Sequence, residues 1–222
     1  MATMYEMIMD LPLFKGVGKD HVSYFLEKTN VDFHNYNQGE VIAEFGNPVR
    51  MVRFVISGEV NLIHPLNGID ISVEERSGFG KVLAADRLFG LSTGYPYKAV
   101  ATMRTSILEF SKEQYISLLH SDRIYMLNFF NYLSLRAQRG VDCLTRINHG
   151  DIGSRLRQLV CVMTDPGAVG VVINGNDEAF SEYCCTTLEN VRQWKKELME
   201  SGLAECDSDA IHIKSRRRFV DM

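Results

Sequence analysis

The sequence predicts an α+β protein that contains a roll of short β-strands, a long α-helix, and a C-terminal helix pair followed by a β-hairpin. Three observations predict this fold. Short apolar segments separated by Gly, Asn and Pro turns fill residues 31–110, an apolar seven-residue repeat lies within residues 121–148, and two capped helical segments precede a hairpin pattern after Asn176. We expect three domains, residues 1–120, 121–148 and 149–222.

The first 30 residues have a helical pattern, and the segment after them has the pattern of a roll. Asp20 is a candidate cap for a helix from His21 to Lys28. Gly39, Gly46 and Gly58 stand at turns where a positive φ or close backbone passage is needed. The expected buried N-terminal residues are Leu11, Phe14, Val17, Val22, Phe25 and Leu26, and the expected strands are residues 40–44, 51–56, 59–63, 69–73, 100–103 and 106–110.

Residues 111–148 predict two consecutive helices. Ser111 with Gln114 forms a capping-box pattern, and Ser121–Asp122 marks a break before the longer second helix. That helix carries apolar or small residues at alternating spacings of four and three: Met126, Phe130, Leu133, Ala137, Gly140, Leu144 and Ile147. Such a seam is typical of a coiled coil, and it predicts a homodimer. A helix packed only into the core of its own chain is the alternative.

The C-terminal region predicts a helix, a tight turn and a second helix. Residues 149–151 form a hinge, residues 152–164 a helix and residues 169–173 a short strand. Asn176 is a good cap for a first short helix that ends at Cys184. Thr186 and Thr187 can cap a second helix, residues 188–201, which ends before Gly202. Residues 204–206 and 211–213 then flank an Asp/Ser-rich turn, as the strands of a wing do.

The second helix of this pair has one apolar and one polar face. Its apolar residues are Val191, Trp194, Leu198 and Met199, and its polar residues are Glu189, Asn190, Arg192, Gln193 and Lys196. A helix with hydrogen-bonding side chains on its outer face is suited to the major groove of DNA. We therefore expect a winged helix-turn-helix that binds DNA. A small helical domain with a surface hairpin is the alternative.

The charge balance does not by itself favour DNA. The net charge is −4, and the region from His149 onward holds nine Lys or Arg against twelve Asp or Glu. The basic residues are instead local, at Arg192, Lys195, Lys196, Lys214 and 216–218. A second hypothesis is therefore a ligand-binding sensor module whose C-terminal domain no longer binds DNA.

Several other classes of protein are not expected. No apolar run reaches the about 18 residues of a transmembrane helix, and the N-terminus lacks the basic segment of a signal peptide. We expect a cytoplasmic protein without membrane contact. Its five cysteines should be reduced, small core residues: Cys143, Cys161, Cys184, Cys185 and Cys206. No enzyme or metal motif is present, so we expect no catalytic residues and no metal site.

The roll, the long helix and the winged helix-turn-helix together resemble the bacterial cyclic-AMP receptor protein and FNR family of transcription factors. The resemblance covers nearly the whole chain. Its motifs are Leu11–Pro12–Leu13–Phe14, Gly39–Glu40–Val41–Ile42 and Val55–Ile56–Ser57–Gly58–Glu59–Val60. It implies a dimeric transcriptional regulator of a pseudo-palindromic DNA site, with RNA polymerase as a further candidate partner.

The resemblance also implies which side chains contact DNA. In this family the start of the second helix of the motif reads the bases, and here it holds Thr187, Leu188, Glu189, Asn190, Arg192 and Gln193. Arg192 is expected to contact guanine and Glu189 cytosine. Leu188 departs from the basic residue that is often present at its position. Lys196 and Arg216 are the expected phosphate contacts.

The effector pocket is where the sequence departs from the family. Members that bind cyclic nucleotides carry Phe-Gly-Glu and then Pro-Arg-Ser/Thr-Ala, but here the segments are Phe89–Gly90–Leu91 and Pro96–Tyr97–Lys98–Ala99. Without the Glu and the Arg, a buried phosphate loses its main partners, so we expect that cyclic AMP does not bind.

The replacements leave the effector open. The pocket residues are expected to be Phe89, Gly90, Leu91, Tyr95, Tyr97 and Lys98. They suit an apolar or planar ligand such as haem, or they fill the pocket themselves. An FNR-type iron–sulfur cluster is not expected, because the first cysteine is Cys143.

Overall fold

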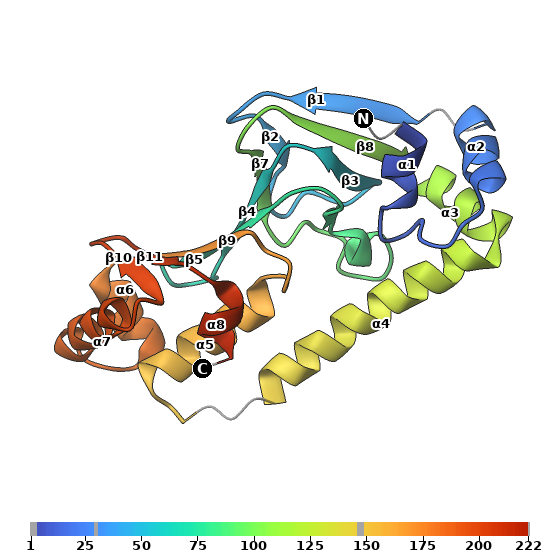
Figure 1. The fold of residues 1–222 in the computed structure, drawn as a ribbon. Coiled ribbons are helices and arrows are strands. Elements are labelled where there is room, and N and C mark those ends of the chain that lie inside the picture. The colour runs from blue at the N-terminus through green and yellow to red at the C-terminus, as the bar shows by residue number, and fades with distance from the viewer. Residues whose placement is uncertain (1–3, 29–30, 146–148, 222) are drawn as a thin grey trace. The chain divides into compact units, whose positions relative to one another are not determined.

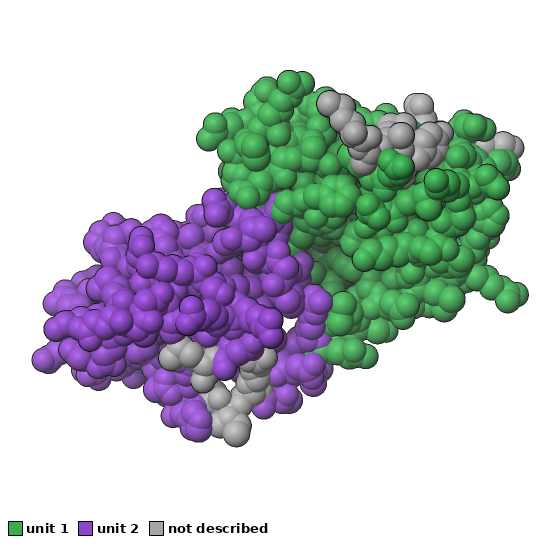
Figure 2. Space-filling model, viewed as in Figure 1, with its two compact units in different colours: residues 1–60, 78–138 green, residues 61–77, 139–222 purple. Residues whose placement is uncertain are grey.

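The computed structural model describes residues 4–28, 31–145 and 149–221 and confirms the α+β fold (Figure 1). By its internal contacts the chain divides into two compact units, which Figure 2 shows in two colours. Unit 1 holds residues 1–60 and 78–138, and unit 2 holds residues 61–77 and 139–222. The hairpin of residues 61–77, which we expected in the first domain, thus groups with the C-terminal residues.

Unit 1 contains the roll and the first helices. Strands β1, β8, β3 and β6 form a sheet in that order, and β2 pairs with β7. Its elements are α1 (Met4–Met9), α2 (Lys19–Lys28), β1 (Asp32–Tyr36), β2 (Val41–Ala43), β3 (Met51–Ser57), β6 (Val82–Leu83), the short 3₁₀-helix η1 (Ala85–Arg87), β7 (Lys98–Ala101), β8 (Thr105–Ser111), α3 (Lys112–Ser121) and most of α4 (Arg123–Thr145).

The core of unit 1 is aromatic. Phe14 makes ring contacts with Phe25, Phe54, Phe110 and Tyr125 at centroid distances of 5.6–6.5 Å. These rings come from the N-terminal segment, from β3, from β8 and from α4, so they join helices and sheet. The expected buried N-terminal residues are buried, except Leu26, which is half-buried.

Local signals set several boundaries in this unit. The capping box at Ser111 and Gln114 is confirmed, since each side chain bonds the backbone of the other. Asp20 is not a cap, because α2 begins at Lys19. Gly58 has a φ of 81°, and a Cβ there would lie 2.5 Å from the carbonyl oxygen of Arg104, so this turn requires glycine.

Unit 2 combines a hairpin with the C-terminal helices. Its strands lie in the order β10, β11, β9, β5, β4. Its further elements are β4 (Val60–Pro65), β5 (Ser72–Ser77), α5 (Ile152–Met163), β9 (Gly170–Asn174), α6 (Asp177–Cys184), α7 (Leu188–Glu200), β10 (Ala204–Cys206), β11 (Ala210–Ile213) and α8 (Arg216–Val220).

Strand β5 extends the sheet of the wing. It pairs antiparallel with β9, from Ser72 opposite Asn174 to Arg76 opposite Gly170. Ile71 and Val73 lie in the same apolar core as α5, α6 and α7. The hairpin is therefore an integral part of unit 2. The expected strand at residues 69–73 lies further along the chain, at residues 72–77.

The expectation that all five cysteines are reduced is wrong. Cys143 and Cys161 form a disulfide, because α4 and α5 bring their Cα atoms to 5.8 Å. Cys184 is buried, Cys206 is half-buried and Cys185 is exposed. Among the described residues, none of the helices combines the length and the apolar character that a membrane span requires.

Candidate functional site

Two local caps position the helix pair of the candidate DNA-binding site. The Asn176 side chain accepts a hydrogen bond from the Ala179 amide at 2.8 Å, and Thr187 Oγ1 accepts one from the Asn190 amide at 3.2 Å. Between the helices Cys185 has a φ of 50°, a left-handed value that turns the chain sharply. Gly202 follows α7 with a φ of 72°. The helices, their caps and the stop agree with the pattern in the sequence.

Helix α7 presents a continuous polar face. Val191 and Leu198 are buried against the core of unit 2. On the opposite face the structure brings together most of the expected DNA contacts, all of them exposed: Thr187, Glu189, Asn190, Arg192, Gln193 and Lys196. Leu188 is half-buried, and Met199, which we expected on the apolar face, is exposed. The face offers donors and acceptors for base edges.

A buried ion pair ties α7 to α6 and to the wing. Lys195 is only 6% exposed, and its Nζ donates to Asp177 Oδ1 at 2.8 Å and to the Asp207 carbonyl oxygen at 3.3 Å. The ammonium also lies 4.9 Å from the centroid of the Phe180 ring. These contacts give Lys195 a structural role, although it is one of the basic residues that the sequence places on this helix.

The same carboxylate holds Arg192. Arg192 Nε donates to Asp177 Oδ2 at 3.0 Å, and 66% of the Arg192 side chain remains exposed. Hydrogen bonding from Lys195, and then from Arg192, lowers the pKa of Asp177. The contact orients the guanidinium on the exposed face of α7.

Arg216 lies apart from this face. Although a phosphate contact is expected from the sequence, the Arg216 guanidinium donates to Thr164 Oγ1 at 2.7 Å, to the Thr164 carbonyl oxygen at 2.9 Å and to the Cys161 carbonyl oxygen at 3.3 Å. It thus satisfies carbonyl groups at the end of α5. Arg217, whose Nε lies 3.8 Å from Asp221 Oδ2, and Arg218 are exposed.

The wing follows α7 as expected. Strands β10 and β11 pair from Ala204 opposite Ile213 to Cys206 opposite Ile211. At the turn, His212 Nε2 lies 3.1 Å from Asp207 Oδ2, and hydrogen bonding, first from the Asp209 amide and then from His212, lowers the pKa of Asp207. The turn of the wing therefore carries an ionised carboxylate at Asp207.

The expected effector residues differ in their exposure and in their contacts. Phe89 packs against the ring of Phe129 on α4, and Leu91 is fully exposed. Gly90 is exposed as well. Tyr97 is buried, and its ring centroid lies 6.2 Å from that of Tyr95, while Lys98 pairs at the surface with Glu44 at 3.3 Å.

The buried residues before Phe89 include Ala84 and Ala85. Ala84 follows β6 with a φ of 49°, a conformation that favours glycine, and Ala85 after it is fully buried at the start of η1. Gly90 and Leu91, by contrast, are exposed.

The roll contains a cluster of polar side chains that is not expected from the sequence. Arg53 donates to Glu109 Oε1 at 2.9 Å, to the Ile42 carbonyl oxygen at 3.0 Å and to the Tyr95 hydroxyl at 3.1 Å. Burial raises the pKa of Tyr95, so this hydroxyl stays neutral. The cluster borders an open cavity of about 550 Å³, lined by Val41, Ile42, Ala43, Glu44, Asn47, Pro48, Arg50, Met51, Arg53 and Tyr95. Glu109 neutralises Arg53, and the other charged residues of the lining are Arg50 and Glu44, of which Glu44 pairs with Lys98.

The candidate dimer seam lies on an exposed face of α4. Tyr125 and Phe129 are buried within unit 1, whereas Met126, Phe130 and Leu144 are exposed, Phe130 by 54% and Leu144 by 65%. Ala137 is also exposed, and Leu133 and Gly140 are half-buried. Val141, which is not one of the residues expected from the sequence, extends the exposed stripe. Ile147 lies outside the described residues.

Comparisons with solved structures confirm the fold that the resemblance implies. The chain is similar to the catabolite activator protein of Thermus thermophilus, with a TM-score of 0.52, 20% identity and coverage of 94% of this chain and 96% of that one. It is also similar to the c-di-GMP-responsive global regulator CLP of Xanthomonas campestris, with a TM-score of 0.55, 19% identity and coverage of 88% and 99%.

These neighbours are regulators of the cyclic-AMP receptor protein and FNR type, and at such identities the likeness is one of fold. The sequence matches no protein-family model and no curated protein.

Proposed function

We propose that this protein is a dimeric, sequence-specific DNA-binding transcriptional regulator. The exposed polar face of α7, preceded by α6 and followed by the β10–β11 wing, is the observation that supports this proposal most strongly. Thr187, Glu189, Asn190, Arg192 and Gln193 would read bases, and Lys196 would contact phosphate. We further propose that it acts in the cytoplasm, with RNA polymerase as a candidate partner.

The dimer would form along α4. A second copy of the helix would cover Met126, Phe130, Ala137 and Leu144, whose apolar surface the single chain leaves in water. Two copies of α7 would then enter successive major grooves, about 34 Å apart, on a pseudo-palindromic site.

Replacing Gly140 by alanine tests this seam. In the single chain a Cβ at this position meets nothing within 4 Å, and alanine favours a helix by about 1 kcal/mol over glycine. If two backbones approach closely at Gly140, the added methyl group overpacks the seam and weakens the dimer about tenfold. Analytical ultracentrifugation over a dilution series measures the dissociation constant.

Gln138→Ala is the matched control for this substitution. Gln138 is exposed on α4, about a third of a turn away from the apolar stripe. It should leave the dissociation constant unchanged. A Gly140→Ala chain that dimerises as tightly as the wild type would show that close approach at this position is not part of the interface.

The effector of this regulator would not be cyclic AMP. The roll segment lacks the carboxylate and the guanidinium expected for a cyclic nucleotide, and Arg53 is already engaged by Glu109 and Tyr95. Burying a phosphate without a charged partner in such a site would cost several kcal/mol of binding free energy. The resemblance supplies the rest of the proposal: a signal in the roll alters the packing of α4.

DNA selection by the purified full chain tests the function. Genomic fragments are incubated with the protein at about 50 mM and 200 mM salt, with and without cyclic AMP. We expect selective binding to a two-fold site that weakens steeply with salt and does not respond to cyclic AMP. Selective binding that appears only with cyclic AMP would contradict the proposed effector behaviour.

The acidic balance of residues 149–222 favours a second candidate, a sensor module whose C-terminal domain no longer binds DNA. The engagement of Lys195 and Arg216 in internal contacts reduces the free positive charge further. This candidate predicts no selection of any DNA fragment at either salt concentration.

A further inference from the structure

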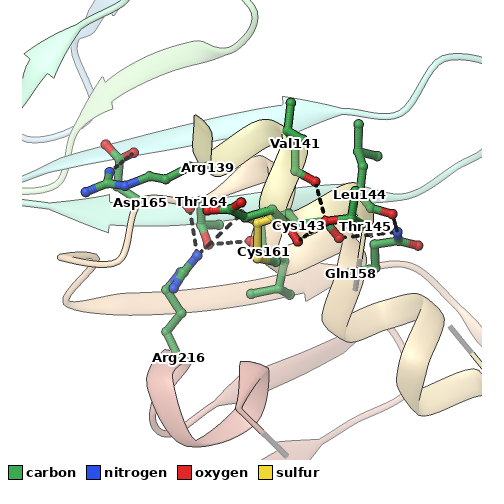
Figure 3. The surroundings of a disulfide bond; sticks show 12 residues. Arg139, Val141, Cys143, Leu144, Thr145, Gln158, Cys161, Thr164, Asp165 and Arg216 are labelled. Atoms are coloured by element: carbon green, nitrogen blue, oxygen red, sulfur yellow. Dashed lines mark hydrogen bonds and ion pairs between the residues drawn. A yellow bond between two sulfur atoms is a disulfide. The ribbon is translucent and has the colours of Figure 1, made fainter. Parts of the chain in front are cut away.

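The disulfide joins the last turns of α4 to the last turn of α5, the first helix after the hinge (Figure 3). Cys143 lies in the last turns of α4, and Cys161 is 18 residues further along the chain. The two residues are only 6% and 8% exposed and belong to the apolar core of unit 2. The covalent bond is therefore part of the packing between these helices.

The other contacts at this junction are weak. Gln158 Nε2 donates to the carbonyl oxygens of Cys143 at 3.4 Å and Leu144 at 3.3 Å, and Arg139 pairs with Asp165 at 3.8 Å (Figure 3). Long hydrogen bonds and a partly exposed ion pair contribute little, so the disulfide is the strongest of these connections between the two helices.

We propose that Cys143 and Cys161 form a reversible redox switch that controls DNA binding, with the disulfide form binding more tightly. This inference rests on the proposed function. In a reducing cytoplasm, disulfides that do form are usually transient or redox-sensing. The bond lies between the proposed dimer helix and the proposed DNA-binding helices, so its reduction would alter how firmly these helices are held together and thereby affect DNA binding.

The chemistry is thiol–disulfide exchange with a dithiol. One thiolate of the dithiol attacks a sulfur of the Cys143–Cys161 bond, and the other sulfur leaves as a thiolate that takes up a proton. The second thiol of the reductant then attacks the mixed disulfide. Two electrons and two protons pass to the protein, which gains two thiols, and the reductant becomes a disulfide. A disulfide oxidant reverses each step.

The oxidised form is expected to bind DNA more tightly because the disulfide limits the freedom of α5 relative to α4. Binding to a two-fold site requires both α7 helices at a fixed separation, so any freedom between α4 and α5 must be lost on binding. The disulfide removes this freedom beforehand, because it closes the loop that contains the hinge. By linkage, DNA that prefers the oxidised form must also protect the bond from reduction.

Two of the three remaining cysteines, Cys184 and Cys206, are poor exchange partners. Burial raises the pKa of Cys184 to about 11 and raises that of Cys206, so their thiolates are scarce at neutral pH. Cys185 is exposed in the turn of the helix pair and is the natural control for oxidation at the DNA-binding surface itself.

The test uses the full chain, equilibrated with mixtures of reduced and oxidised dithiothreitol. Alkylation and mass spectrometry count free thiols, and fluorescence anisotropy measures affinity for a selected DNA site. We expect three free thiols in the oxidised form, five in the reduced form and about fivefold or greater weakening of DNA binding on reduction. Bound DNA should shift the midpoint of reduction to more reducing mixtures.

Variants separate the switch from other oxidation. Cys143→Ser and Cys161→Ser should each bind DNA like the reduced wild type and no longer respond to dithiothreitol, and Cys185→Ser should respond like the wild type. Since the wild type is compared in two redox states, the test does not depend on how well the variants fold.

Two results would overturn the switch: five free thiols after oxidation, or equal or tighter DNA binding by the reduced form. If neither form binds any DNA, the proposed function is wrong and the control of DNA binding fails with it, while the thiol count separately decides whether the bond forms.

Discussion

Replacing Asp177 by asparagine is expected to destabilise unit 2 by about 2–3 kcal/mol at neutral pH. Its carboxylate lies 2.8 Å from the buried ammonium of Lys195 and is itself 20% exposed. Without this negative charge Lys195 keeps the carbonyl of Asp207 and the ring of Phe180, which do not neutralise it. Urea unfolding followed by circular dichroism measures the change in the free energy of unfolding.

The same pair makes stability depend on pH. Hydrogen bonding from Lys195 lowers the pKa of Asp177 from its ordinary value of 3.8. A carboxyl group with a lower pKa in the folded state stabilises the fold above its unfolded pKa, and this contribution is lost as the pH falls through the folded pKa. The difference in unfolding free energy between the wild type and Asp177→Asn should therefore be constant above about pH 5 and shrink in more acidic solution.

Glu178→Gln is the matched control, because Glu178 is the exposed neighbour of Asp177 in the first turn of α6. Both substitutions remove a negative charge near the N-terminus of the helix, which costs about 0.3–1 kcal/mol. Only Asp177→Asn removes the partner of Lys195. Adding Lys195→Met to Asp177→Asn should recover much of the loss. Equal losses in the two single variants would mean that the ion pair adds nothing to stability.

The elements that the sequence predicted well are those set by interactions between residues that are close together in the sequence. Asn176, Thr187 and Ser111 bond backbone amides three residues away, so a short stretch of sequence contains both partners. The long helix and the positions of the roll strands follow from apolar periodicity in the same way. These signals were sufficient for the α+β fold and for the exposed face of α7.

The features that the sequence did not predict depend on distant residues. Strand β5 pairs with β9 about 100 residues later, and no local pattern sets that register. A lysine on a helix is usually exposed, so the burial of Lys195 becomes visible only when Asp177 is brought beside it. The same holds for Arg216, whose partners lie on α5, and for the disulfide, which requires α4 and α5 to meet.

The most direct consequence of the proposed function concerns Arg192. Replacing it by alanine should weaken binding to the selected DNA site by about 1–3 kcal/mol, or roughly 5- to 150-fold, and relax sequence preference at one base pair of each half-site. The reason is its exposed guanidinium, which Asp177 orients at the start of the polar face. Anisotropy titrations against the selected site and against single-base variants measure both effects.

Lys196 provides the contrasting case on the same face. Lys196→Ala should weaken binding about equally for all sequences and reduce the slope of log affinity against log salt by about one, because a phosphate contact carries no sequence information. Arg104→Ala, an exposed substitution in unit 1, is the control and should change neither quantity. If Arg192→Ala instead weakens every sequence equally and lowers the salt slope, Arg192 contacts phosphate, and base reading must come from Glu189, Asn190 or Gln193.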